Sequence, residues 1–164
     1  MYTQRLIIDK MQESDKTDYF ENITHNKKVL ETFMCNYTKT LDELNFTPYT
    51  ESKKIFAIRL KETQKLIGII CYFNETESCC EIGYAIGETY WNKGYTTEAV
   101  KEFISYCFTH LKFKKVFASF FVGNKASESV MKKCGMIYDH FSEKELNYNK
   151  EDKDLIYYSI SKPD

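Results

Sequence analysis

The feature that most constrains the fold is a strand-like run, a short turn and a long amphipathic helix, in that order, between residues 79 and 111. Residues 79–87 are largely apolar and end in the turn around Gly94. Apolar residues then recur at intervals of three and four, at Val100, Phe103, Ile104, Cys107, Phe108 and Leu111. This spacing places a single apolar stripe along one helix face. A strand-like run at 116–122 follows, so the segment predicts a parallel βαβ unit with a right-handed crossover.

The rest of the chain predicts an α+β fold: one domain over residues 1–164, with a mixed, mostly antiparallel sheet of about six to seven strands and helices on both faces. Strands are expected at 5–9, 54–60, 66–73, 79–87, 116–122, 136–141 and 155–160. Helices are expected from Ser14–Asp15 through Ile23, near 29–35 and 41–46, with Pro48 breaking the pattern, and after the N-cap residue Asn124 up to Gly135. The charged segment 143–154 reads as an exposed hairpin loop.

Composition excludes several classes of protein. The 164 residues are 43% hydrophobic with a net charge of −1, which argues against disorder, a nucleic-acid-binding footprint and a polybasic membrane anchor. The longest apolar run, 66–73, is too short to span a bilayer. The N-terminus lacks the basic start and apolar core of a signal peptide, so we expect a cytoplasmic protein.

Cysteine and histidine usage predicts no metal site. The six cysteines match no zinc-ligand spacing, and the adjacent Cys79 and Cys80 would point to opposite faces of a strand. We expect reduced thiols, several of them in the core. Histidines are scattered at 25, 110 and 140, and each is interpreted as structural or exposed.

The turn at Gly94 is a candidate anion site. A small-residue turn that opens a helix directs backbone N–H groups and the positive end of the helix dipole toward one point, which suits a phosphate or pyrophosphate. It lacks the glycine patterns of dinucleotide folds and nucleotide P-loops, so NAD and ATP are disfavoured. A tight connection without any ligand is the alternative for this segment taken alone.

Three segments together carry a family resemblance: 81–86, 90–99, and 124–136 with Asn124, Ser127 and Gly135 in it. In this order and spacing the chain resembles the GCN5-related N-acetyltransferases (GNAT). The opening Thr3-x-Arg5-Leu6-Ile7-Ile8 resembles the ribosomal-protein N-acetyltransferase branch, the RimJ and RimL relatives. The resemblance extends over about residues 3 to 161.

The resemblance implies acetyl-CoA as co-substrate and no metal. Backbone groups of Lys93, Gly94, Tyr95, Thr96 and Thr97 would hold the pyrophosphate. The pantetheine arm would add like a strand beside Tyr84, Ala85 and Ile86, where the family's strand carries a bulge and splays from its neighbour. Asn124 and Ser127 match positions that contact the cofactor, although Asn124 also suits simple helix capping.

The implied chemistry is direct attack of an amine on the thioester. Glu81 is the candidate base, with a solvated strand-end carboxylate as the alternative, and a backbone N–H near Ile86 would stabilise the oxyanion. Ser127 is the candidate acid, because the tyrosine that many members carry is replaced here by Met131. Thr96 also departs from the usual small residue. A covalent route through Cys134 is the disfavoured alternative.

The acceptor stays open among a protein N-terminus, a polyamine and another small amine. Residues 20–50 and 143–154 would shape its pocket, with ordinary packing as the alternative role for the side chains available there: Tyr19, Phe20, Glu31, Phe33, Tyr37 and Tyr49. Competing functions are a CoA-binding sensor or interaction protein without turnover and a bare structural domain. We expect a monomer or homodimer with no nucleic-acid or membrane partner.

Overall fold

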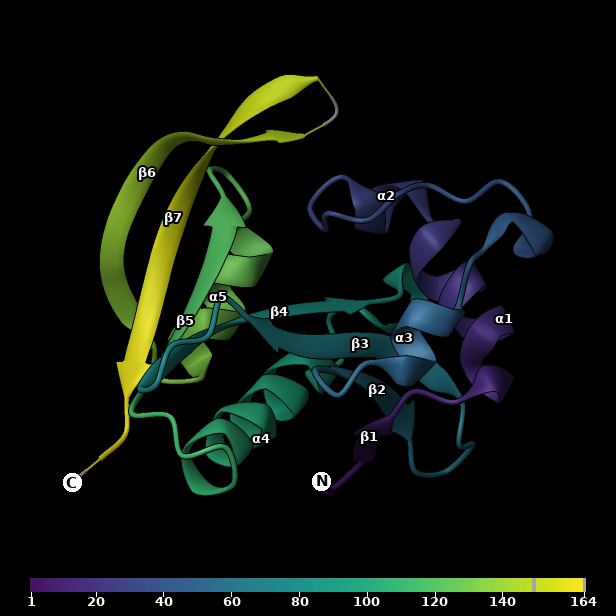
Figure 1. The fold of residues 1–164 in the computed structure, drawn as a ribbon, viewed down its shortest axis with the longest axis horizontal. Helices are drawn as coiled ribbons and strands as arrows, with labels where there is room; N and C mark the ends of the chain where they lie inside the picture. The colour runs from purple at the N-terminus through teal and green to yellow at the C-terminus, as the bar shows by residue number, and fades with distance from the viewer. Residues whose placement is uncertain (149, 164) are drawn as a thin grey trace. The chain divides into compact units, whose positions relative to one another are not determined.

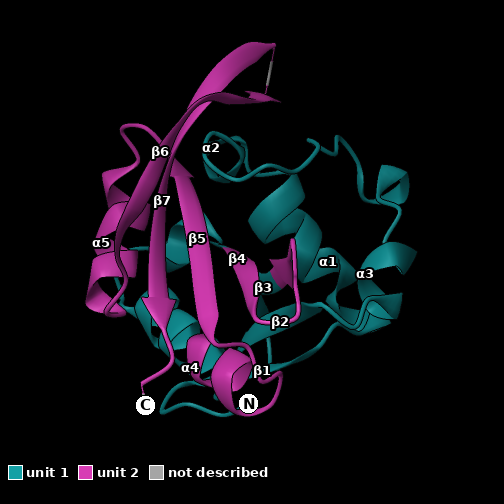
Figure 2. Cartoon of the chain, turned by 60° about the vertical axis from the view of Figure 1, so that its left-hand side comes forward, with its two compact units in different colours: residues 1–71, 84–103 teal, residues 72–83, 104–164 magenta. Residues whose placement is uncertain are grey.

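The computed structural model describes residues 1–148 and 150–163. Seven strands pair in the order β1-β2-β3-β4-β5-β7-β6, and helical segments occur between them, which confirms the predicted fold class (Figure 1). The chain divides into two compact units, each described here by itself (Figure 2). Unit 1 comprises Met1–Cys71 and Tyr84–Phe103, and unit 2 comprises Tyr72–Gly83 and Ile104–Asp164.

Unit 1 contains an antiparallel meander. Strand β1 (Leu6–Lys10) pairs with β2 (Ile55–Leu60), and β2 pairs with β3 (Leu66–Phe73) with a register shift between Ile58 and Arg59. Strand β4 spans Cys79–Ile86 and bridges the two units. Isoleucine occurs in each of these strands, as expected for pleated, buried surfaces. The predicted strands of this region are confirmed.

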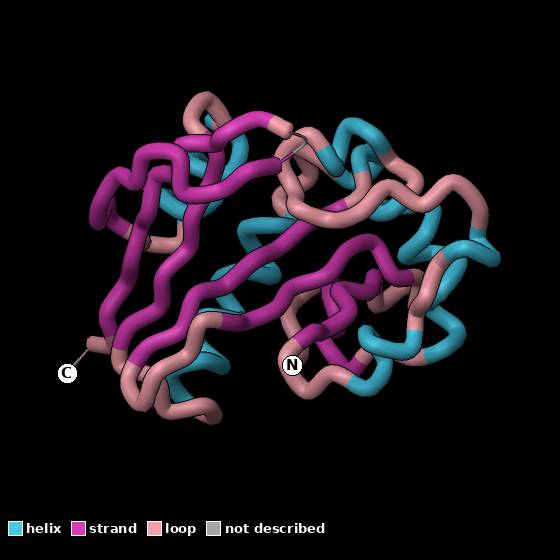
Figure 3. Tube along the Cα trace, turned by 45° about the horizontal axis from the view of Figure 1, so that its top comes forward, coloured by secondary structure: helices cyan, strands magenta, loops and turns pink. Residues whose placement is uncertain are grey.

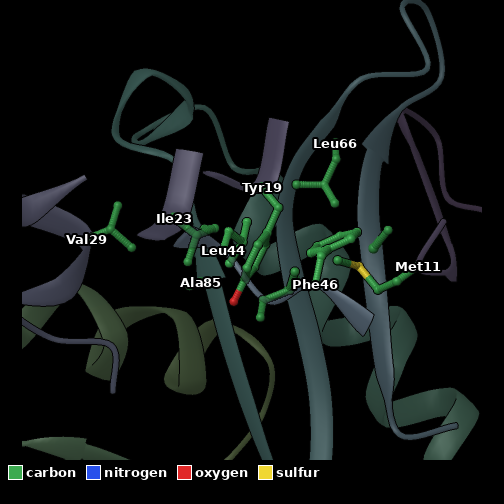
Figure 4. Close-up of a cluster of buried hydrophobic side chains, with 10 residues drawn as sticks. Met11, Tyr19, Ile23, Val29, Leu44, Phe46, Leu66 and Ala85 are labelled. Carbon is green, nitrogen blue, oxygen red and sulfur yellow. The ribbon is translucent and has the colours of Figure 1, made fainter. Parts of the chain in front are cut away.

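Helical turns between β1 and β2 complete unit 1: η1 (Glu13–Asp15), α1 (Lys16–Tyr19), η2 (Phe20–Thr24), α2 (Lys27–Leu30), η3 (Leu41–Glu43) and α3 (Thr47–Glu51). Their apolar side chains pack onto the strands around the fully buried Tyr19 and Ile23, as Figure 4 shows. The predicted helix through Ile23 is confirmed, while those at 29–35 and 41–46 are shorter than expected. The prediction that Pro48 breaks a helix was wrong. Pro48 lies in the first turn of α3, where its missing N–H costs nothing.

Helix α4 (Tyr95–Thr109) begins directly after Gly94, as predicted. Its apolar stripe is buried, with Val100, Phe103 and Cys107 at 0% exposure. Within unit 1, the Phe103 ring packs edge-on against Phe56 of β2 at a centroid distance of 5.4 Å. The short 3-10 turn η4 (Glu88–Tyr90) separates the helix and its turn from β4.

Unit 2 contains the start of β4 paired in parallel with β5 (Lys115–Phe121), so the predicted parallel strand pair is confirmed. The register joins Cys79–Glu81 to Lys115–Phe117, and β5 pairs on its other side with β7 (Glu151–Ser161). Helix α5 (Lys125–Lys133) follows β5, and its C-terminal end is followed by Gly135 at φ +81°, the left-handed residue predicted there.

The prediction that 143–154 forms a loop was wrong. Strand β6 runs from Ile137 to Tyr148, and β6 and β7 pair nearly to the tip of the hairpin, with Leu146 opposite Lys153 and Tyr148 opposite Glu151 (Figure 3). Most side chains of β6 are exposed, so charged residues are tolerated and the alternating apolar signal of a half-buried strand is missing. The Tyr148 ring stacks on Phe121 with a centroid distance of 5.8 Å.

Candidate functional site

The turn between β4 and α4 contains two left-handed residues just before the helix begins. Asn92 and Gly94 both adopt left-handed conformations, with φ of +60° and +81°. The N–H of Glu98 donates to the Gly94 carbonyl at 3.1 Å, which is the first bond of the α4 ladder. The N–H groups in the first turn of a helix have no carbonyl partner within the helix. Those of Tyr95 and Thr96 can therefore donate to a bound ligand.

Arg5, the residue just before strand β1, contacts this turn within unit 1. Its Nη1 donates to the carbonyl of Lys93 at 2.9 Å, and its Cζ lies 4.4 Å from the centroid of the Tyr95 ring. Its Nε and Nη2 both bind Oε2 of Glu98, at 2.8 and 2.7 Å. The resemblance had singled out Arg5 only as part of an opening motif, and this contact with the turn was not predicted.

Glu98 is fixed by more than Arg5. Its Oε1 accepts from the Thr3 hydroxyl at 2.6 Å and from the Arg5 backbone N–H at 2.8 Å. Burial opposes ionisation of Glu98, but the hydrogen bonds from Thr3 and Arg5 and the charge of Arg5 outweigh it, so the pKa of Glu98 lies below its usual range. The carboxylate is therefore charged at neutral pH and ties α4 to the N-terminal segment.

The end of β4 presents backbone groups on the edge opposite β3. The Gly87 N–H donates to the Ile67 carbonyl of β3 at 2.9 Å, so the strand alternation turns the groups of Ile86 to the other edge. The Trp91 indole donates to the Ile86 carbonyl at 2.7 Å. On the β3 side, a Cβ at Gly68 would collide with the Ala85 carbonyl, so glycine is required there for the strands to approach. Sequence reasoning missed both Trp91 and Gly68 as determinants of this segment.

Glu81, in unit 2, is not a solvated strand-end carboxylate. Its exposure is 8%, and it accepts hydrogen bonds from the Ser119 hydroxyl at 2.7 Å and the Asn74 side-chain amide at 3.1 Å. The pKa of the Tyr157 phenol is raised above its usual value, first by burial and next by the nearby negative charge of Glu81. Sequence reasoning missed both donors, because Ser119 and Asn74 belong to other segments of unit 2.

Asn124 caps helix α5, as predicted. Its Oδ1 accepts from the Ser127 backbone N–H at 3.1 Å. Ser127 therefore lies in the first turn of α5 and is partly buried. Met131, at the position where the resemblance leads us to expect tyrosine, is 1% exposed and packs inside unit 2. Cys134, the disfavoured nucleophile, is also buried.

The predicted site residues thus form two groups, one in each unit. Unit 1 brings the backbone of Tyr84, Ala85 and Ile86 into one continuous segment with the turn 93–97. Unit 2 contains Glu81, Asn124 and Ser127. Across residues 1–148 and 150–163, no three His, Cys, Asp or Glu side chains gather as metal ligands would. No helix in the same ranges is both long and apolar enough to cross a membrane.

Comparison with known proteins identifies the family. The model of the acetyltransferase (GNAT) domain matches residues 5–137, so the chain belongs to this family of acyltransferases, whose members transfer an acetyl group from acetyl-CoA to an amine. N-acetyltransferase p20 of Bacillus licheniformis is 31% identical over 127 residues, which cover 62% of this chain and 71% of the relative.

Solved structures agree on the fold. The GNAT-family acetyltransferase of Bacillus anthracis superposes with a TM-score of 0.89 at 28% identity, covering 98% of this chain and 97% of that one. A spermidine N-acetyltransferase of Vibrio cholerae, solved with CoA and spermine, superposes with a TM-score of 0.81 at 17% identity, covering 96% and 95%. At that identity the second likeness concerns the fold alone.

Proposed function

We propose that this GNAT-family chain acetylates a primary amine, with the turn 93–97 binding the pyrophosphate of acetyl-CoA. The observation that carries the proposal is the left-handed Gly94 immediately before α4, where backbone N–H groups and the helix dipole favour an anion. Acetyl-CoA supplies the activated acetyl group. The pantetheine arm is proposed to lie along β4 at Tyr84, Ala85 and Ile86, where the Ile86 N–H is on the edge away from β3, and Thr96 and Thr97 add hydroxyls beside the phosphates.

The proton chemistry is assigned to unit 2. An attacking amine is protonated at neutral pH, since alkyl ammonium groups have a pKa near 10 and peptide α-amines near 8. Glu81 is the proposed acceptor of that proton, directly or through water. Its two hydrogen-bond donors fix the carboxylate in one orientation. Ser127 is the proposed donor to the departing thiolate, and the backbone N–H of Ile86 is proposed to stabilise negative charge on the carbonyl oxygen.

The acceptor is proposed to be a protein N-terminus, a polyamine or another small amine. A spermidine N-acetyltransferase has this fold, so the fold is compatible with a polyamine acceptor. The Thr3-x-Arg5-Leu6 opening supports the RimJ/RimL-like branch and hence a protein N-terminus. Of the aromatic candidates, Tyr19 belongs to the core of unit 1 and Tyr37 is 46% exposed, so Tyr37 is the better acceptor contact. A single domain over 1–164, a monomer or homodimer and a cytoplasmic location remain predictions.

Turnover is tested by incubating the protein with acetyl-CoA and a panel of amines while free thiol is measured. The panel contains polyamines, aminoglycosides and peptides that begin with Ala, Ser or Thr. We expect thiol release above the no-amine background with at least one class. CoA binding without release for any amine would instead favour the second candidate, a CoA-binding protein without turnover, for which the replacement of tyrosine by the buried Met131 is the supporting observation.

Binding itself is tested by thermal stability. A ligand at 100 times its dissociation constant adds about 2.7 kcal/mol to the free energy of unfolding. CoA at saturating concentration is therefore expected to raise the melting temperature by several degrees. A melting temperature that does not move would contradict both candidates.

Asn124 offers a test that separates helix capping from ligand contact. Replacing Asn124 by alanine removes the acceptor for the Ser127 N–H and is expected to lower the free energy of unfolding by about 1 kcal/mol. Asn124→Ser keeps a capping oxygen but shortens the side chain, so stability should be nearly retained. If Asn124 also contacts the cofactor, both variants raise the KM for acetyl-CoA. A KM that follows stability alone would leave Asn124 as a cap only.

A further inference from the structure

We propose that Arg5 is a positioning residue for the phosphate turn: its guanidinium fixes the Lys93–Gly94 peptide so that the Gly94 N–H is aimed for pyrophosphate binding. The inference rests on the proposed function of the turn. It deepens that function by naming the side chain that orients the backbone of the turn, which lies 88 residues away in the sequence.

The Lys93–Gly94 peptide plane has its direction set by Arg5. In a planar trans peptide, the C=O and the following N–H point in opposite directions. The Lys93 carbonyl is held by Arg5 Nη1 at 2.9 Å, so the N–H of Gly94 points away from Arg5. Gly94 is in the left-handed region at φ +81°, and a glycine there can rotate the adjoining peptide at little steric cost. Without the contact from Arg5, nothing in the glycine itself would keep its N–H in this direction.

The Arg5 guanidinium is itself held in place. Its Nε and Nη2 both bind Glu98 Oε2, while its face lies against the Tyr95 ring at 4.4 Å. Glu98 is in turn fixed by the Thr3 hydroxyl and the Arg5 backbone N–H. A side chain with this many contacts has one orientation, so the carbonyl bound to its third nitrogen has one orientation as well.

The positive charge of Arg5 is balanced by a neighbouring carboxylate. Arg5 is paired with the ionised Glu98, which neutralises most of the field that the guanidinium would exert on a phosphate. The pair therefore contributes little as a free positive charge. What an arginine adds at this position is its planar fork, which reaches a carboxylate and a carbonyl at the same time. A lysine ammonium carries the same charge without that fork.

The test compares two thioesters that differ in their phosphates. Acetyl-CoA carries the pyrophosphate, and acetyl-pantetheine lacks all phosphates. Arg5→Ala and Arg5→Lys are each expected to raise the KM for acetyl-CoA about 10-fold, the effect of losing hydrogen bonds to charged groups. The kcat/KM for acetyl-pantetheine should stay at the wild-type value. 3′-Dephospho-acetyl-CoA, which keeps the pyrophosphate, should show the same 10-fold effect as acetyl-CoA.

Lys61→Ala is the matched control. Lys61 also places a cation on the N-terminal segment, where its Nζ donates to the Thr3 carbonyl and lies 6.0 Å from the Tyr2 ring. Its ammonium contacts Thr3 and Tyr2 rather than the turn 93–97, so its removal should leave the KM for acetyl-CoA unchanged. Glu98→Gln keeps the side-chain shape while weakening the hold on Arg5. It should raise the KM for acetyl-CoA by a smaller factor than Arg5→Ala does. If Arg5→Ala does not fold, Glu98→Gln still provides this test.

Three outcomes would overturn the inference. Equal losses with both thioesters would mean that Arg5 acts only on general stability. Full activity of Arg5→Lys would mean that charge alone matters, and unchanged kinetics in folded Arg5→Ala would mean that Arg5 does not act on the turn. Failure of the underlying function has a different signature: the wild type itself would then use acetyl-CoA and acetyl-pantetheine equally well.

Discussion

Gly94→Val is expected to lower kcat/KM for acetyl-CoA about 100-fold, because the turn cannot keep its conformation with a β-branched residue. Gly94 lies at φ +81°, where a valine is a genuine outlier and strain costs of order 1–3 kcal/mol. An added Cβ would also lie 3.3 Å from Arg5 Nη2, tighter than an ordinary contact. Both effects favour a negative φ at residue 94, which would turn its backbone N–H away from the direction proposed for phosphate binding. A 100-fold loss corresponds to about 2.7 kcal/mol.

Gly135→Val is the matched control for this prediction. Gly135 has the same φ of +81°, and its added Cβ would meet only Ile160 Cδ1, at 3.6 Å. The two variants should lose comparable amounts of stability, measured as the free energy of unfolding in urea. Only Gly94→Val should lose acetyl-CoA binding, measured by calorimetry with CoA. A similar loss of CoA affinity in Gly135→Val would trace the effect to stability and remove the turn from the binding site.

Periodicity explains which parts of the fold were predictable. The apolar stripe of α4 and the strands of the meander bury one face or both, so their hydrophobic spacing records the structure directly. The hairpin 143–154 left no such record, since two paired but exposed strands can carry charges on both faces. Pro48 was misread for a different reason. A proline ends a helix when it lies in the interior and begins one when it lies in the first turn, and the sequence does not state which.

The candidate site was likewise predictable only in the parts that are local in sequence. The helix start after Gly94 and the cap at Asn124 are local in sequence, so both were predicted and are confirmed. Contacts such as that of Arg5 with Glu98 join residues 93 positions apart, and no spacing rule connects them. Such contacts can be found only once the strand pairing of the fold is known. The burial of Glu81 is of the same kind, since its donors come from other segments of unit 2.

Glu81→Gln is expected to lower kcat by about 10²- to 10⁴-fold at neutral pH, the range for loss of a general base. Glutamine keeps the shape of the side chain, and its carbonyl oxygen can still accept from the Ser119 hydroxyl that lies 2.7 Å from Glu81. It cannot take a proton from an ammonium. The KM for acetyl-CoA should therefore change little, and the melting temperature should fall by only a few degrees. Initial rates with the best amine of the panel measure kcat.

Asp139→Asn is the control, because Asp139 is also a unit 2 carboxylate that accepts from a serine hydroxyl, that of Ser159 at 2.9 Å, but it lies in β6 outside the residues proposed for the chemistry or the acceptor pocket. Its kcat should equal that of the wild type. The deciding measurement is the pH dependence of the Glu81→Gln deficit. This pH series uses a peptide acceptor, because a peptide α-amine loses its proton near pH 8 without help and the ammonium that Glu81 would deprotonate disappears as pH rises. The ratio of wild-type to Glu81→Gln kcat should shrink steadily between pH 7 and about pH 9.5. A ratio that stays constant would identify Glu81 as a structural partner of Ser119 and Asn74, and the proton would then leave by another path.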